Sequence, residues 1–329
     1  MSLDALQPAP PKRIAVIDMA RGLALLAMAS YHFTWDLGFF GYTDASLTAF
    51  GGWKIYARSI ASTFLFLVGV SLVLAHGNGI RWRGFWKRFA MVAGAAAAIT
   101  AVTLVATPDS FIFFGILHQI ALASVLGLLF LRLPALLTAL IAALVIATPF
   151  YLRSPLFDHP ALWWVGLPTF TLRSNDYVPL FPWFGVVLAG MAATKLASSS
   201  GLLGRLGSFS ATRLTRPLVF IGRHSLAFYL IHQPVLIACV WLASQIAPAP
   251  VETRQDNFLR SCQVSCEQTR DSAFCRAYCG CMLDALGQDG TLDALYGGGQ
   301  GADLDAHVAE LAGQCTQRTD EAATGGEMP

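Results

Sequence analysis

The chain has 329 residues, of which 55% are hydrophobic and only 13% are charged, and its mean hydropathy is +0.55. Soluble globular domains carry about 25% charged residues, so this composition excludes an ordinary soluble domain. It indicates a membrane protein. We therefore expect its partner to be the lipid bilayer and not nucleic acid. Residues 1–250 hold 17 Lys and Arg against 7 Asp, a net charge of +10, whereas residues 251–329 hold 5 Arg against 13 acidic residues, a net charge of −8.

Seven apolar runs are long enough to span a bilayer, and they predict an all-α fold, a polytopic transmembrane helix bundle. The runs lie at 14–33, 55–75, 89–106, 111–131, 135–151, 180–197 and 218–242. We therefore divide the chain into four predicted parts: a cytoplasmic N-terminal segment (1–12), a transmembrane domain (13–246), a small Cys-rich, helical tail (247–315), and a C-terminus (316–329) whose composition favours disorder.

The distribution of basic residues predicts which side of the membrane each loop occupies. Lys and Arg are concentrated in the N-terminal segment and in the loops after the second, fourth and sixth runs. By the positive-inside rule the N-terminus is then cytoplasmic, and an odd number of spans places the tail on the outer side of the membrane. The first thirteen residues lack the charged-then-apolar layout of a cleaved signal peptide, so the first span is expected to remain.

The stretch 17–36, which contains most of the first run, carries four ionisable residues on one side of the predicted helix: Asp18, Arg21, His32 and Asp36. At 100° per residue, Arg21 and His32 are about 20° apart, and each Asp lies about 40° from His32. Ionisable groups within a span are expensive, so a single polar stripe facing the bundle interior predicts a functional site. The alternative is that Asp18 and Arg21 form an ion pair that only fixes helix packing.

The loop after the second run, IRWRGFWKRF, contains a cluster of cations: Arg81, Arg83, Lys87 and Arg88. Arginine can bind a phosphate through two hydrogen bonds, so the cluster predicts a site for a phosphate-bearing donor on the cytoplasmic side. The alternative interpretation is topological, because the positive-inside rule expects such clusters and anionic lipid would also bind them.

Two later spans contribute further histidines. His118 lies seven residues into the fourth run, about 10 Å deep from the outside. His232 lies sixteen residues past Arg216, about 24 Å from the cytoplasmic side, with Ser225 and Tyr229 on the same helix face. Together with His32, these two histidines are predicted to place three imidazole rings at a similar depth, in the outer half of the membrane. Asp36, four residues after His32, is expected to orient its ring so that it can act as a general base.

The tail carries six of the seven cysteines: Cys262, Cys266, Cys275, Cys279, Cys281 and Cys315. Two pairs spaced i, i+4 and separated by eight residues suit a helical hairpin joined by disulfides Cys262–Cys279 and Cys266–Cys275, which leaves Cys281 for Cys315. Six cysteines allow fifteen connectivities, and this one is geometrically the simplest. A four-thiolate zinc site is the alternative if the tail is cytoplasmic; otherwise we predict no metal site.

Several motifs resemble a known family. They are D-M-A-R-G-L-A-L-L-A-M-A-S-Y-H-F, F-L-F-L-V-G-V-S, G-I-L-H-Q-I-A-L-A, L-F-P-W-F-G and I-G-R-H-S-L-A-F-Y-L-I-H-Q-P, spread over residues 12–245. They are similar to the bacterial branch of the heparan-α-glucosaminide N-acetyltransferase catalytic family, which is related to the acyltransferase-3 membrane proteins.

This resemblance implies transfer of an acetyl group from cytoplasmic acetyl-CoA to a sugar amine or hydroxyl on the far side of the membrane. In the acyltransferase-3 proteins an essential histidine follows the Arg-Gly motif, and His32 matches its position. Their closing S-x-x-x-Y-L-x-H motif matches Ser225, Tyr229 and His232, and their arginines match Arg81, Arg83 and Arg88 only approximately. The animal enzymes carry their essential histidine after the first span, where this chain has none before His76, so the resemblance does not identify the acceptor.

The resulting hypothesis is a polytopic membrane acetyltransferase in which His32, Asp36, His232 and His118 form the catalytic set. Arg81, Arg83 and Arg88 would bind acetyl-CoA, and Arg21 with Asp18 would either contact the CoA arm or lock the helix. Because longer relatives have more spans, the chain is either a reduced core or one half of a homodimer. A proton-coupled transporter is the rival class, since buried His, Asp and Arg serve transport too, and a scaffold for the disulfide-linked tail is a third.

Overall fold

A computed structural model describes residues 14–44, 47–49, 51–249, 254–296 and 302–325. These residues form α-helices and short 3-10 helices, with no β-strand among them, which confirms the all-α prediction. The predicted N-terminal segment 1–12 lies outside the described residues. The helices outside the tail are α1 (Ala15–Phe39), α2 (Gly51–His76), α3 (Trp82–Ala106), α4 (Ile116–Gly127), α5 (Ala135–Tyr151), α6 (Leu180–Ser199), α7 (Leu202–Gly207), α8 (Arg216–Arg223) and α9 (Ser225–Ile246).

Four of the described helices, α2, α3, α6 and α9, are long and apolar enough to cross a membrane. Two shorter apolar helices, Ile116–Phe130 and Ala135–Tyr151, correspond to the fourth and fifth predicted spans. Helix α1 has 25 residues, enough to cross, but its ionisable groups lower its hydropathy. The chain is therefore a multi-pass membrane protein, while the number of seven spans stays a prediction.

The chain divides into two compact units, and the division passes through three helices. The first unit contains residues 1–29 and 57–232, and the second contains residues 30–56 and 233–329. In this division the C-terminal parts of α1 and α9 belong to the same unit as the tail, and the domain boundary at residue 246 stays a prediction.

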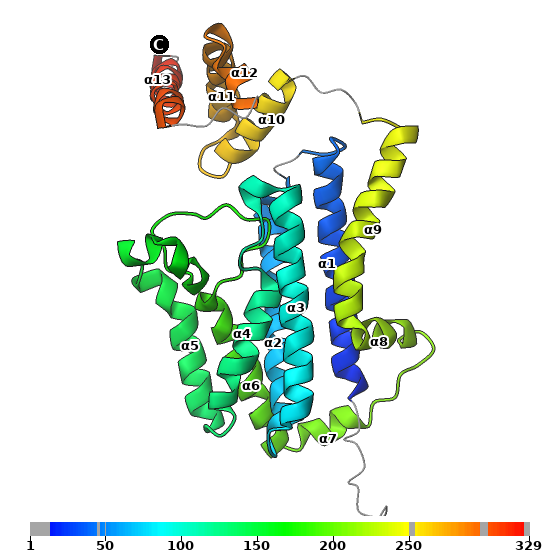
Figure 1. Ribbon diagram of the computed structural model, residues 1–329. Coiled ribbons are helices and arrows are strands. Elements are labelled where there is room, and N and C mark those ends of the chain that lie inside the picture. Colours follow the sequence, from blue (N-terminus) through cyan, green and yellow to red (C-terminus); the bar gives the residue numbers. More distant parts are fainter. Residues whose placement is uncertain (1–13, 45–46, 50, 250–253, 297–301, 326–329) are drawn as a thin grey trace, which may run out of the picture. The chain divides into compact units, whose positions relative to one another are not determined.

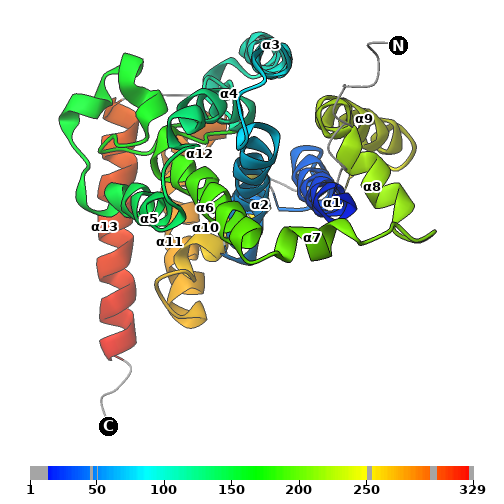
Figure 2. The ribbon, with the colours of Figure 1, turned by 90° about the horizontal axis from the view of Figure 1, so that it is seen from below.

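The first unit is built around α6, which lies between α5 and α2 (Figures 1 and 2). Its core contains Leu65 of α2 and Val187, Leu188 and Met191 of α6, all fully buried. Helices α2 and α6 approach closely because two glycines face the partner backbone: a Cβ on Gly69 or Gly190 would overlap a main-chain carbonyl of the other helix. Small residues at such crossings are typical of helix packing in membranes.

Helix α4 begins later than the sequence predicts. Residues 111–115 are not helical, and their main chain is hydrogen-bonded to the α5–α6 connection through Phe114 O and Val178 N, 3.0 Å apart. Helix α4 therefore starts at Ile116 rather than Phe111. The hydrogen bond between His118 Nε2 and the Thr100 hydroxyl places this start beside α3, about 9 Å before the end of that helix.

The last predicted span is also divided. Helix α8 ends at Arg223, His224 has φ −105° and ψ 31°, and α9 starts at Ser225. Helix α8 packs against the first half of α1, because Gly22 and Gly222 each lie against a main-chain carbonyl of the other helix. The run 218–242 is therefore two helices, and a depth measured along one continuous helix does not hold.

In the second unit, the end of α1 is joined to the end of α9 by a hydrogen bond from the Tyr42 hydroxyl to Ala247 O. The tail of this unit is helical as predicted, with α10 (Arg254–Cys266), α11 (Ser272–Gln288), α12 (Thr291–Tyr296) and α13 (Ala302–Gly325).

Three disulfides join the tail helices: Cys262–Cys279, Cys266–Cys275 and Cys281–Cys315. The predicted pairing is thereby confirmed, and the zinc alternative is wrong because disulfide sulfurs are not thiolate ligands. The third disulfide joins α11 to α13 beside Leu286, which is fully buried.

The disorder expected from residue 316 stays a prediction. In the structure helix α13 continues past Cys315, Thr319 is buried, and Arg270 forms an ion pair with Asp320 at 3.3 Å. A disulfide and an ion pair hold this helix, and composition reveals neither of them. Residues 326–329 lie outside the described residues.

Candidate functional site

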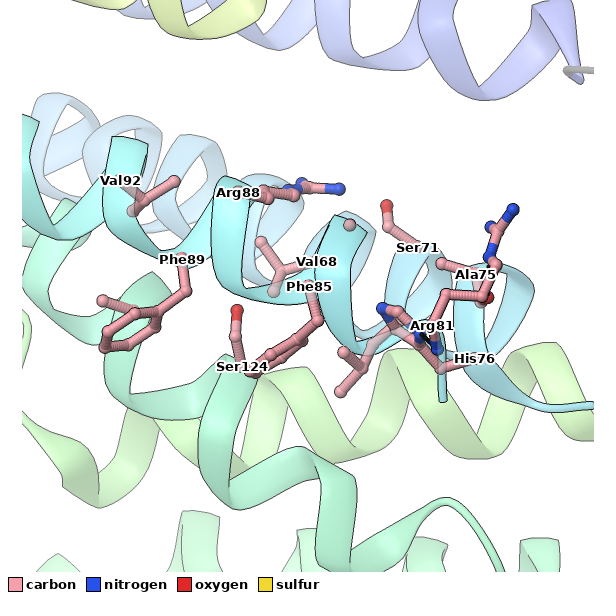
Figure 3. A pocket seen from close by; sticks show the side chains of 13 residues that line it. Val68, Ser71, Ala75, His76, Arg81, Phe85, Arg88, Phe89, Val92 and Ser124 are labelled. Atoms are coloured by element: carbon pink, nitrogen blue, oxygen red, sulfur yellow. Dashed lines mark hydrogen bonds between the residues drawn. The ribbon is translucent and has the colours of Figure 1, made fainter. Parts of the chain in front are cut away.

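A cavity of about 390 Å³ lies between α2, α3 and α4 of the first unit. This volume falls within the roughly 300–1,000 Å³ usual for small-molecule sites. Thirteen side chains line it, and none of them is acidic (Figure 3). The lining residues are Val68, Ser71, Leu72, Ala75, His76, Arg81, Gly84, Phe85, Arg88, Phe89, Val92, Ala121 and Ser124.

One end of the cavity is cationic. Arg81 and His76 lie together at this end, and Arg88 lies farther along the same wall (Figure 3). The backbone N–H of Arg81 donates to His76 Nδ1 at 3.2 Å, so the neutral His76 ring carries its proton on Nε2 and can donate a hydrogen bond. Of the three predicted donor-site arginines, Arg81 and Arg88 line the cavity, whereas Arg83 does not.

Arg21 reaches the same wall from α1. Its guanidinium donates to Asp18 Oδ1 at 2.9 Å and to the hydroxyl of Ser71, a lining residue. The other oxygen of Asp18 lies 3.5 Å from Arg223 of α8. Asp18 therefore holds both α8 and the Arg21 side chain in place, and a contact between Arg21 and the CoA arm stays a prediction. Arg21 and Arg88 are close enough to repel each other, which leaves excess positive charge beside the cavity.

The other end of the cavity is apolar. Phe89 and Val92 lie at this end, opposite His76 and Arg81 (Figure 3). Ala121 completes it from α4, where it packs in a cluster with Val92 and Leu117. The cavity thus suits an amphipathic ligand with an anionic head and a neutral arm.

His118 occupies the start of α4, where both ring nitrogens make hydrogen bonds. Nδ1 accepts from the backbone N–H of Gly115 at 3.2 Å, and Nε2 lies 3.1 Å from the Thr100 hydroxyl. That hydroxyl donates to Ile112 O at 2.7 Å, so it must accept from Nε2. The single lone pair of the neutral ring therefore accepts a hydrogen bond, so these contacts give His118 a helix-capping role, and its role as a base stays a prediction.

Asp176 caps the same helix from the α5–α6 connection. Its Oδ2 accepts from the backbone N–H of Ile116 at 2.8 Å, which satisfies one of the free N–H groups at the start of α4. Burial raises the pKa of the Asp176 carboxyl to about 6, and the hydrogen bond from Ile116 only partly opposes this effect.

This raised pKa predicts how stability depends on pH. The fold favours protonated Asp176, so its stabilising contribution is complete below about pH 4 and is lost as the pH rises through about 6. Relative to Asp176→Asn, the wild-type free energy of unfolding should fall by about 2 kcal/mol between pH 4 and pH 7. Unfolding of both proteins across this range measures the difference, and parallel pH profiles would contradict it.

His232 lies seven residues into α9, about 10 Å from the start of that helix, not about 24 Å along a continuous helix from Arg216. Its Nδ1 lies 2.8 Å from Tyr229 O, and since a carbonyl only accepts, Nδ1 must carry the proton. The lone pair of the neutral ring is then on Nε2, which is the arrangement a general base requires. Tyr229 packs against the apolar clusters of α3, α4 and α6, and Ser225 is the first residue of α9.

His32 and Asp36 belong to the second unit. The His32 ring makes an edge contact with Tyr31, with ring centroids 5.8 Å apart. Asp36 is fully buried and accepts a hydrogen bond from Gln233 Nε2 of α9 at 2.7 Å. The orientation of His32 by Asp36 stays a prediction, because the hydrogen bond observed at Asp36 comes from Gln233.

Sequence reasoning missed several residues of these sites. His76 and Ser124 line the cavity but belong to no quoted motif, and Ser71, also a lining residue, ends the F-L-F-L-V-G-V-S motif but was not singled out there. Gln119, fully buried on α4, makes no side-chain hydrogen bond to the described residues. A polar residue within an apolar run was the one signal that could have singled out Gln119 and Gln233.

Comparisons with known proteins identify one family. A family model described as heparan-alpha-glucosaminide N-acetyltransferase, catalytic, matches residues 13–234. No curated protein and no solved structure matches the chain.

Proposed function

Because the chain belongs to the heparan-alpha-glucosaminide N-acetyltransferase catalytic family, whose model covers residues 13–234, we propose that it transfers an acetyl group from cytoplasmic acetyl-CoA to an amine or hydroxyl of a sugar outside the cytoplasm. Family membership makes the chain a membrane protein of the acetyltransferase type. The donor, the acceptor and the direction across the membrane are our proposal.

The cavity between α2, α3 and α4 is the observation that carries this proposal. Acetyl-CoA has several phosphates at one end and a neutral thioester arm at the other. The cavity has a matching polarity, with Arg81, Arg88 and the Nε2–H of His76 toward one end and Phe89 and Val92 at the other. A cavity without acidic side chains and with two arginines favours a phosphate-bearing ligand over a cationic or neutral one.

The chemistry then needs a base for the acceptor. The acceptor nitrogen or oxygen attacks the thioester carbonyl, the C–S bond breaks, and the thiolate of CoA leaves. The proton that the acceptor loses goes to an imidazole and then to the thiolate. We propose His232 for this role because its lone pair is on Nε2, and His32 because it matches the essential histidine of related proteins.

We also propose that the N-terminus is cytoplasmic and that the tail lies in the periplasm of a bacterial inner membrane. The basic loops support this orientation through the positive-inside rule. The three disulfides of the tail support it independently, because disulfides persist in oxidising compartments.

The test is acetyl transfer by the purified protein. The protein in lipid nanodiscs is incubated with acetyl-CoA labelled in the acetyl group, together with glucosamine or a glycan acceptor. We expect label on the acceptor and release of stoichiometric CoA. If proteoliposomes instead move a small molecule across the membrane while acetyl-CoA stays intact, the protein is a transporter and the proposal is wrong.

A further inference from the structure

The connection from α6 to α9 lies within the first unit and contains the short helices α7 and α8. Helices α6 and α9 are both long and apolar enough to cross the membrane, so the residues between them, 200–224, join two spans at one face of the bilayer. Helix α7 has six residues and α8 has eight, and neither is long enough to cross. The connection therefore stays beside the surface of the bilayer.

This connection is cationic and contains no acidic residue. Arg205, Arg213 and Arg216 are exposed, and none of them forms an ion pair with another described residue. The chain has no Asp or Glu at all in residues 177–251. Because a guanidinium group can bind a phosphate through two hydrogen bonds, these three side chains are available to an anionic, phosphate-bearing partner.

Large apolar side chains are interspersed with the arginines. Leu214 is 87% exposed, Phe220 is 64% exposed, and Phe209 is exposed as well. Such side chains are unfavourable in water, but at the surface of a bilayer they can enter the acyl chains while neighbouring cations stay among the headgroups. Exposed cationic and apolar side chains within one short segment therefore indicate contact with the bilayer surface and not with water alone.

Helix α8 holds part of this surface in a fixed orientation. Gly22 of α1 and Gly222 of α8 each lie against a main-chain carbonyl of the other helix, so α8 crosses α1 closely (Figure 1). Phe220 precedes Gly222 by two residues and therefore lies on the opposite side of α8 from this contact. The His224 ring packs against Phe220 with ring centroids 4.5 Å apart. A surface that is already ordered loses little conformational freedom when a partner binds.

We propose that Arg205, Arg213 and Arg216, together with Leu214 and Phe220, form a binding surface for the headgroups of anionic phospholipids. The arginines bind the headgroup phosphates, and the two apolar side chains enter the upper part of the acyl region. An acidic soluble protein would also match the arginines, but the lipid is the partner that the two flanking spans place beside this surface. The inference does not depend on the proposed acetyl transfer.

Lipid binding to the protein purified in detergent tests this surface. Native mass spectrometry measures the binding of phosphatidylglycerol, which is anionic, and of phosphatidylcholine with the same acyl chains, which has no net charge. We expect phosphatidylglycerol to bind at least tenfold more tightly than phosphatidylcholine. The double variant Arg213→Gln and Arg216→Gln should reduce this preference at least fivefold, because it removes two of the three phosphate ligands.

The double variant Arg153→Gln and Arg173→Gln is the matched control. It removes the same charge from two exposed arginines of the α5–α6 connection, outside the proposed surface. Its preference for phosphatidylglycerol should stay within about twofold of wild type. Equal losses in the two double variants would show that only the total charge of the protein matters, and an unchanged preference in Arg213→Gln and Arg216→Gln would show that the lipid binds elsewhere. Either result overturns the inference.

A fluorophore at position 214 tests the contact with lipid without removing an arginine. Leu214→Cys is labelled with bimane in a Cys239→Ser background, because Cys239 is the free cysteine of the described residues. In bilayers of phosphatidylcholine and phosphatidylglycerol, we expect quenching by phosphatidylcholine that carries a doxyl group high on its acyl chain, and little quenching by aqueous iodide. Quenching by iodide but not by the doxyl lipid would place residue 214 in water, favour a soluble acidic partner, and overturn the inference.

Discussion

Replacement of His232 by alanine is expected to lower kcat for acetyl transfer by about 10²–10⁴-fold, the usual contribution of a general base. The reason is the tautomer that the helix imposes: Nδ1–H donates to Tyr229 O, so the lone pair of the neutral ring is on Nε2, the nitrogen that would take the proton. Binding of CoA, measured by titration calorimetry, should be unchanged, because His232 does not line the donor cavity.

His118 provides a control within the same unit. Its lone pair accepts from Gly115 N–H, so we expect His118→Gln, which keeps a hydrogen-bonding side chain, to retain kcat within a few-fold of wild type. His32→Ala tests the residue that the family resemblance identifies, and a loss as large as that of His232→Ala would assign both imidazoles to the reaction. If His118→Gln lowered kcat as much as His232→Ala does in folded protein, the choice of His232 over His118 as the base, which rests on the ring tautomers, would be wrong.

Replacement of Arg88 by glutamine is expected to weaken CoA binding about 10–100-fold. A hydrogen bond to a charged group contributes about 1.5–3 kcal/mol, and Arg88 faces a cavity whose lining contains no acidic residue that could retain it. Arg81→Gln should have an effect of similar size. Titration of CoA into each purified variant measures the change in Kd, and near-wild-type kcat at saturating acetyl-CoA would show that binding alone is affected.

Arg83→Gln is the matched control for this prediction. Arg83 lies five residues before Arg88 on α3 and carries the same charge, but it does not line the cavity. We expect its Kd for CoA to stay within about twofold of wild type, because it is not among the side chains that would contact the ligand. Equal weakening by Arg83→Gln and Arg88→Gln would favour the alternative interpretation, in which the loop serves topology and lipid binding.

The features that the sequence determined by itself all depend on local periodicity and composition. The cysteine spacing in the tail is the clearest example, because residues four apart share a helix face and two such pairs can meet only if the helices are antiparallel. The apolar runs and the basic loops can likewise be recognised from residues that are close together in the sequence. The helical class and the disulfide pairing are confirmed because no distant contact is needed to predict them, whereas the orientation in the membrane stays a prediction.

Tertiary structure decided where the helices begin and how each polar side chain is used. Helix α4 starts at Ile116 because Asp176, sixty residues later, caps it, and the run 218–242 is broken at His224 where α8 packs against α1. The same kind of distant contact gave Asp36 its partner Gln233. An imidazole or a carboxylate within an apolar run has the same sequence signal whether it caps a helix or meets a ligand. The hydrogen bonds to its atoms distinguish the two roles, and those bonds come from residues remote in the chain.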